Sequence, residues 1–293
     1  MPTRILRTQH ATSRSLIKLA AAMLAACCAD AGVGGVRAQG KVEAQYSVTL
    51  GGLPFGKGSW QIDVRDDQFS AVASGTTSGF IRLFTRGRGA SAVRGTVAGG
   101  QLAASTYSSS INTDKRYDDV RMVMQGANVK EAVAEPPTMP TPDRVPLTEA
   151  HRRGVADPMT AALIRVPGTG DTFVPEACHR TLAVFDGRMR YDLQLAYKRL
   201  DKVRSERGYQ GTVVVCSVHF LPIAGHIPTR PVIKYLVNLH DIEMWLAPIA
   251  GTRVMVPYRV SMTTPLGQGV LEATQFVTVP YPPRTASSAT KPQ

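Results

Sequence analysis

The sequence predicts a mainly β protein whose antiparallel strands have one packed face. Three observations favour this class: period-two alternation of apolar and polar residues, a convincing helix signal in one place only, and an Asp-Gly hairpin signal between two alternating runs. The 293 residues are 43% hydrophobic and 19% charged, so the chain is long and apolar enough to bury a sizeable core.

Alternating runs fill the first half of the chain, from Val42 to about Val133. Gln45 to Leu50 is one such run and Ser59 to Val64 is the next, with a Gly- and Pro-rich turn between them. This pattern predicts antiparallel strands packed on one side. Residues 136–146 hold five prolines, which predict an extended crossover at 134–148 inside a single domain of residues 39–280.

The second half begins with a helix signal and a hairpin signal. Asp157 precedes Pro158 and a run of good helix formers to Ile164, and Pro167-Gly168 ends the pattern. Asp186-Gly187 between two alternating runs predicts a type I′ turn. Further strands are expected at 212–220, 243–246, 253–262 and 270–279, residues 232–238 fit either a helix or a strand, and residues 281–293 are expected to be disordered.

The first 38 residues predict an export signal. Basic residues precede a short apolar run at 19–26, which is too short to span a bilayer. The Val-Arg-Ala at 36–38 predicts cleavage between Ala38 and Gln39 by signal peptidase. The alternative is a lipobox at 24–27, with acylation of Cys27. No other stretch is long and apolar enough for a transmembrane helix, so we expect the protein in the periplasm or, if acylated, at the outer membrane.

Charge and cysteine usage fit an exported protein. The formal net charge is +12, of which the first 38 residues carry +4. The remaining charge would suit an anionic partner, but a solvated basic surface is the simpler interpretation, and export argues against a nucleic-acid role. Cys178 and Cys216 are the two cysteines beyond the leader, and an oxidising compartment predicts one disulfide between them.

The strand after the Asp-Gly turn offers two candidate surfaces. One is an apolar face, formed by Met189, Tyr191, Leu193 and Leu195, which is expected to be core and would line a ligand groove only where a curled sheet leaves its concave side unfilled. The other is a basic patch, formed by Arg188, Arg190, Lys198 and Arg199. The patch would suit an anionic head group or a partner protein, and a solvated hairpin face is the alternative that we favour.

No motif of a familiar reaction is present: the chain lacks G-x-S-x-G, P-loop, G-x-G-x-x-G and H-E-x-x-H sequences. A hydrolase site around His179, His226 and Asp241 is one alternative. A metal site formed by His219, His226 and Asp241 is another, although a Pro- and Gly-containing loop separates the two histidines. We therefore expect no cofactor, no metal and no enzymatic activity.

Three stretches, at 184–193, 222–226 and 257–267, resemble a proteobacterial family of exported proteins that is known only as a domain of unknown function. Tyr46 to Leu50 and Gly56-Lys57-Gly58 fit the same family. More distantly, such proteins are similar to envelope-integrity β-spiral proteins and to lipoprotein carriers. The resemblance implies one large, strongly curved antiparallel sheet, a β-spiral or half-barrel, that wraps a short helix.

These observations together predict an exported, non-enzymatic envelope protein. It would bind a lipid, a lipoprotein or another envelope partner and would support cell-envelope integrity. A periplasmic hydrolase with an unrecognised site and a purely structural scaffold are the alternatives. The sequence does not define the ligand, the partner or the oligomeric state.

Overall fold

The computed structural model describes residues 39–79 and 86–282. The predicted leader, with Ala38 and Cys27, lies outside the described residues, as does the tail from residue 283. At the boundary of the tail, Tyr281 is held in place, because its hydroxyl donates to Asp63 Oδ2 at 2.8 Å.

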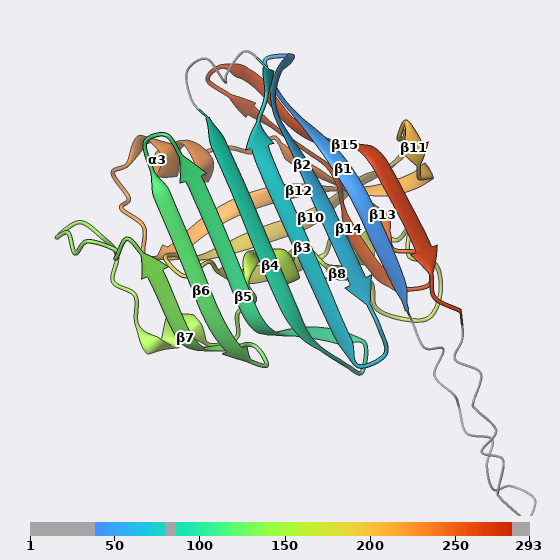
Figure 1. Cartoon of the computed structure of the whole chain (residues 1–293), viewed down its shortest axis with the longest axis horizontal. Coiled ribbons are helices and arrows are strands. Elements are labelled where there is room, and N and C mark those ends of the chain that lie inside the picture. The colour runs from blue at the N-terminus through green and yellow to red at the C-terminus, as the bar shows by residue number, and fades with distance from the viewer. Residues whose placement is uncertain (1–38, 80–85, 283–293) are drawn as a thin grey trace, which may run out of the picture. The chain divides into compact units, whose positions relative to one another are not determined.

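The described strands form one sheet of 15 strands, drawn in Figure 1. The strand order is β7-β6-β5-β4-β3-β2-β1-β15-β14-β13-β12-β10-β9, with β11 beside β15 and β8 beside β14. All pairs are antiparallel except β11 with β15. The strands are β1 Gly40–Leu50, β2 Leu53–Val64, β3 Gln68–Thr77, β4 Gly87–Ala98, β5 Gln101–Thr113, β6 Tyr117–Gln125, β7 Asn128–Glu135, β8 Ile164–Arg165, β9 Arg180–Phe185, β10 Arg190–Arg204, β11 Arg207–Gly208, β12 Gln210–Ala224, β13 Ile242–Pro248, β14 Val254–Thr264 and β15 Gly267–Pro280.

The predicted alternation is confirmed in β1. Val42, Ala44 and Tyr46 are buried, whereas Glu43 and Gln45 between them are exposed. Ala44 lies directly opposite Phe276 of β15, so the first and last strands are neighbours in the middle of the sheet. Burying one face of each strand fixes its register, because a shift of one residue would turn the apolar set toward water.

The predicted helix is present but short. α2 spans Pro158–Ala161, and Asp157 caps it by accepting hydrogen bonds from the backbone N–H groups of Met159 and Thr160, both at 3.0 Å. The prediction that the helix continues to Ile164 is wrong. Ile164 and Arg165 form β8 and pair with Met255 and Val254 of β14, so strand pairing overrides local helix propensity there.

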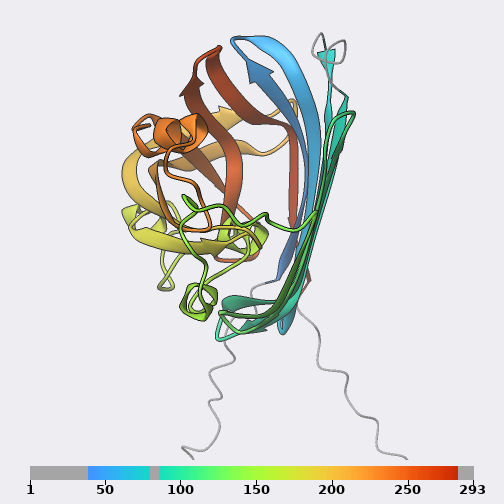
Figure 2. The same cartoon turned by 90° about the vertical axis from the view of Figure 1, so that its left-hand side faces the viewer.

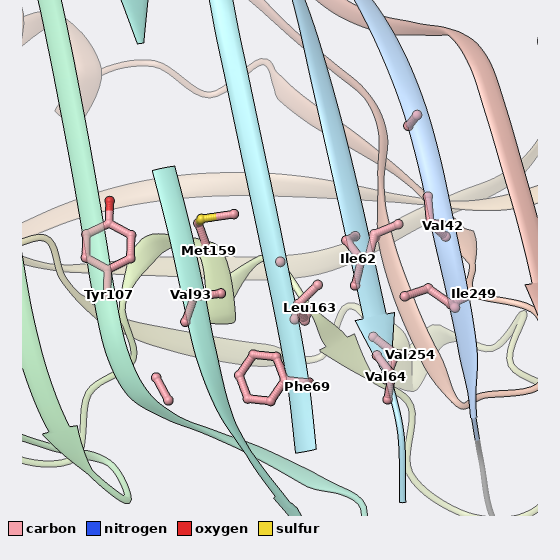
Figure 3. Close-up of a cluster of buried hydrophobic side chains, with 14 of the residues drawn as sticks. Val42, Ile62, Val64, Phe69, Val93, Tyr107, Met159, Leu163, Ile249 and Val254 are labelled. Atoms are coloured by element: carbon pink, nitrogen blue, oxygen red, sulfur yellow. The ribbon is translucent and has the colours of Figure 1, made fainter. Parts of the chain in front are cut away.

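The sheet wraps α2, as the family resemblance implied. α2 contacts β4 and β5 on one side and β9 on the other, and Figure 2 shows it between these two groups of strands. Met159 and Leu163 belong to the first core cluster, which also contains Phe69, Val93 and Tyr107 from the first half of the chain (Figure 3). This cluster therefore joins the two halves of the sheet.

A second core cluster covers the other face of β12. Val213 and Val215 pack in the first cluster, whereas Val214, Cys216 and Val218 pack in the second. The second cluster is completed by residues of two short helices, η3 (Pro175–Ala177) and α3 (Pro231–Val237). The segment at 232–238, which fits either a helix or a strand by its sequence, is therefore helical up to Val237. A further 3₁₀ turn, η2, spans Glu149–Arg152.

The predicted disulfide is confirmed. Cys178 and Cys216 are bonded, with their Cα atoms 5.5 Å apart, and both are fully buried in the second cluster. The bond fastens the segment after η3 to the centre of β12.

The hairpin between β9 and β10 differs from the predicted two-residue turn. Four residues, 186–189, separate the strands. Gly187 has a φ of +92°, as a tight turn requires, and Asp186 Oδ1 accepts the backbone N–H groups of Arg188 and Met189 at 2.8 and 2.7 Å. The aspartate side chain thus organises a longer loop.

The sheet is open and strongly curved. β7 and β9 stand at the two ends of the strand order, yet the turn after β9 lies against β6. Arg188 Nε in that turn is 3.3 Å from Asp118 Oδ1 of β6. Among the residues that the structure describes, no helix is long and apolar enough to cross a membrane.

Candidate functional site

A groove of about 470 Å³ lies over β9, β10 and β12 and gathers three histidines: His179, His219 and His240. We call it the histidine groove. Thr181, Gln194 and His219 lie directly opposite one another on adjacent strands, and Ala196 and Ser217 form the next row. His179 immediately precedes β9 and His240 lies two residues before β13, so strand pairing brings together residues from three parts of the chain.

Two of the three imidazole rings are stacked. The ring centroids of His219 and His240 are 5.2 Å apart and their planes differ by 13°. His219 Nδ1 is buried and has no hydrogen-bond partner within the described ranges. The pair therefore offers hydrogen-bonding capacity that contacts within the described chain leave unused.

A charged network around Trp245 adjoins the groove. The indole ring is flanked by two guanidinium groups, with the Cζ atoms of Arg199 and Arg259 at 5.5 and 4.8 Å from the ring centroid. Trp245 Nε1 donates to Asp201 Oδ2 at 3.1 Å. This hydrogen bond is the main reason that the pKa of Asp201 is lowered. Trp245 is only 6% exposed and belongs to the first core cluster, so the network is anchored in the core.

Glu243 links this network to the groove. It lies directly opposite Ser217, a groove residue, and its carboxylate binds Lys198 and, at 3.0 Å between Oε2 and Nη2, Arg199. The hydrogen bond from Arg199 is the largest of the effects that lower the pKa of Glu243, ahead of the opposing effect of burial. The carboxylate is thereby held in its ionised form beside the groove.

The candidate basic patch is divided into two places, and each member has an acidic partner. Arg188 pairs with Asp118, and Arg190 pairs with Asp192 at 2.6 Å, both near the start of β10. Lys198 and Arg199 lie further along β10 and share Glu243. The four residues thus do not form a continuous surface of unpaired positive charge.

The candidate apolar face packs against the rest of the protein. Leu195 is 5% exposed and belongs to the second core cluster, and Leu193 packs against that cluster. The Tyr191 ring lies 5.3 Å from Phe220, and burial raises the pKa of Tyr191. Met189 lies in the loop before β10.

The two alternative histidine sets are only partly assembled. His179 and His219 line the groove, but His226 and Asp241 do not. His226 is buried elsewhere: its backbone carbonyl accepts from Val145, and burial lowers the pKa of its imidazole. Asp241 binds the backbone and hydroxyl of Thr263. In residues 39–79 and 86–282, no group of three or more His, Cys, Asp or Glu residues is arranged to hold a metal ion.

Sequence reasoning missed His240 and Glu243. No sequence motif surrounds His240, and it joins the groove only when β13 pairs with β12. Glu243 lies in the short predicted strand at 243–246, where a single acidic residue gives no signal of a binding role. Both would have been found only from the register of β12 and β13.

Comparisons with known proteins give a family and one structural likeness. A family model described as "Protein of unknown function (DUF3108)" matches residues 45–274. No curated protein matches the sequence. A crystal structure of a beta-barrel-like protein of domain of unknown function DUF1849 from Brucella abortus is 6% identical, with a TM-score of 0.46, and the match covers 83% of this chain and 98% of that one.

Proposed function

We propose that this chain, which belongs to the DUF3108 family of proteins of unknown function, is an exported, non-enzymatic envelope protein. It binds a lipid, a lipoprotein or another envelope protein and so supports the integrity of the cell envelope. The observation that carries the proposal is the histidine groove beside the Trp245 network. Thr181, Gln194, Ser217 and His219 stand on paired strands, and hydrogen bonds and ion pairs hold the Trp245 network, as a preorganised binding surface requires.

The surroundings of the histidines favour binding over catalysis. A histidine that activates a nucleophile is usually oriented by a hydrogen bond to an acidic side chain. Across the described part of the chain, the imidazoles of His179, His219 and His240 accept or donate no such bond, and the nearby Glu243 is bound to Lys198 and Arg199. The groove thus offers hydrogen-bonding groups without the arrangement of an acid–base chain.

The disulfide supports the exported location. A disulfide between Cys178 and Cys216 would persist in an oxidising compartment such as the periplasm and would be reduced in the cytosol. The short distance between the two cysteines is thus consistent with the export that the leader predicts. The proposed location is therefore the periplasm, or the outer membrane if Cys27 is acylated.

Native mass spectrometry of the mature protein, extracted from the cell envelope without denaturant, tests the proposal. We expect a discrete added mass of lipid size, or co-purification of one envelope protein in a fixed ratio. A protein that carries no added mass and co-purifies with no envelope protein, at native concentration and in several extractions, would contradict it.

A further inference from the structure

The lining of the histidine groove contains no carboxylate. Its polar members are three histidines, one arginine and three neutral residues that form hydrogen bonds, Thr181, Gln194 and Ser217. Thr181, Gln194 and His219 are directly opposed across β9, β10 and β12, so their side chains emerge on one face of the sheet. An acid-free set of hydrogen-bond donors on one face is complementary to an anionic group.

The one arginine among the lining residues is bound on the other face of the sheet. The guanidinium of Arg180 donates to the backbone carbonyls of Arg165 and Glu176, both at 2.8 Å. No carboxylate pairs with it among the described residues, and burial lowers its pKa. Arg180 pairs with Leu195, whereas Thr181 pairs with Gln194, so the Arg180 side chain emerges on the opposite face of the sheet and adds no hydrogen-bond donor to the row of Thr181, Gln194 and His219.

The nearest acids are already committed to other partners. Glu243 of β13 is bound by Lys198 and Arg199, and Asp241 is bound by Thr263. Neither carboxylate is a groove-lining residue. The hydrogen-bonding groups of the groove face are therefore the imidazoles and the neutral side chains of Thr181, Gln194 and Ser217.

We propose that the histidine groove binds a phosphate group, supplied by a phospholipid head group or by free phosphate. This inference rests on the proposed function and gives it a ligand class. The anion contacts the imidazoles of His219 and His240 and the neutral side chains of Gln194, Thr181 and Ser217. His179 lies at the groove margin, where it adds positive charge when it is protonated.

The site predicts that binding depends on pH. The titratable and charged groups around the stacked pair are His179 before β9, Lys198 on β10 and the committed acids Asp241 and Glu243, whereas Arg180 points to the opposite face of the sheet. Two imidazolium rings with centroids 5.2 Å apart repel each other, and a phosphate between their N–H groups removes the repulsion. Binding is thus coupled to proton uptake, and we expect roughly a tenfold gain in affinity or more from pH 8 to pH 5.5.

The test uses the full mature chain and two probes, vesicles containing phosphatidylglycerol and inorganic phosphate. Vesicle sedimentation, with phosphatidylcholine vesicles as the uncharged comparison, measures lipid binding at pH 8 and pH 5.5. Shifts of the imidazole NMR signals during a titration with inorganic phosphate measure the binding of the free anion. The variant is His219→Gln with His240→Gln, which keeps polar side chains, and the matched control is His151→Gln, a histidine bound to Thr148 outside the groove.

The double variant is expected to lose the pH-dependent gain, and the His151→Gln control to keep it. Binding to phosphatidylglycerol alone identifies a lipid head group, and binding of inorganic phosphate as well identifies a general phosphate site. An unchanged pH dependence in the double variant overturns the inference, as does the absence of binding to both probes at pH 5.5. Neither failure contradicts the proposed function, which is tested separately by the mass that the extracted protein carries and by the envelope proteins that co-purify with it.

Discussion

Removal of the Cys178–Cys216 disulfide is the perturbation whose effect the structure defines best. The two cysteines are 38 residues apart, and closing a loop of this length lowers the entropy of the unfolded chain by an amount worth about 4 kcal/mol. Domains of this kind are stable by only about 5–15 kcal/mol in total. We therefore expect the Cys178→Ala, Cys216→Ala double variant to lose a large part of its free energy of unfolding.

Urea unfolding followed by tryptophan fluorescence, at pH 7 and without reductant, measures the loss. The variant should unfold at a clearly lower urea concentration, and reduced wild-type protein should match it. Adding reductant to the variant should change nothing, which is the internal control. A loss below about 1 kcal/mol would refute the reasoning, because it would show that the disulfide does not restrict the unfolded chain as this loop length requires.

Substitutions at three further positions test other parts of the structure. Leu246→Ala, at a fully buried position of the second core cluster, should lower the free energy of unfolding by about 2–5 kcal/mol in urea titrations, and a loss below that range would contradict the assignment of the cluster. Asp157→Ala should lower the free energy of unfolding by about 0.5–2 kcal/mol, because it removes the cap of α2. Asp157→Asn should be at least as stable as the wild type at pH 7, because asparagine can still cap the helix. Burial raises the pKa of Asp157, so the wild type should lose stability as the pH rises above about 3.9, and the asparagine variant should lack this loss. Arg199 lowers the pKa of Glu243, so the ionised carboxylate stabilises the fold at neutral pH, and this stabilisation is lost as the pH falls below the ordinary pKa range of a glutamate. Glu243→Gln should therefore lower the free energy of unfolding by at most about 1 kcal/mol at pH 7 and by less in acid. A loss that grew on acidification would contradict this pairing.

The class of fold follows from the sequence because each strand obeys a local rule. In β1 the alternation of Val42, Ala44 and Tyr46 with polar residues predicts which side is buried, and the structure confirms it. The disulfide was predictable because only two cysteines follow the leader. The strand order was not predictable, because the placement of β1 beside β15 depends on contacts between residues more than 200 positions apart.

The helices show where local signals fail. Residues up to Ile164 are good helix formers, yet Ile164 and Arg165 add a short strand to β14, whose hydrogen bonds a helix could not supply. The segment that became α3 is rich in β-branched residues and gave no clear preference. Pro231 in its first turn is compatible with a helix start, but this signal alone did not decide the assignment.

The candidate site was predictable only in part. His179 and His219 were singled out as titratable residues, but their true neighbour is His240, and neither His226 nor Asp241 lines the groove. The sequence singles out Arg188 before β10 and Arg199 on β10 as members of a basic patch, whereas their acidic partners, Asp118 and Glu243, come from distant strands. Pairing between strands decides which charges meet, and a single sequence does not contain that information.

Export is the central claim of this account, since the disulfide, the proposed location and the class of ligand all depend on it. Its most direct test is to fractionate cells that express the full chain and to determine the intact mass and N-terminus of the protein in each fraction. We predict a periplasmic protein that begins at Gln39 and lacks free thiols, or an outer-membrane form that begins at acylated Cys27 with Cys178 and Cys216 still bonded. A full-length protein with reduced cysteines in the cytosolic fraction would contradict the account.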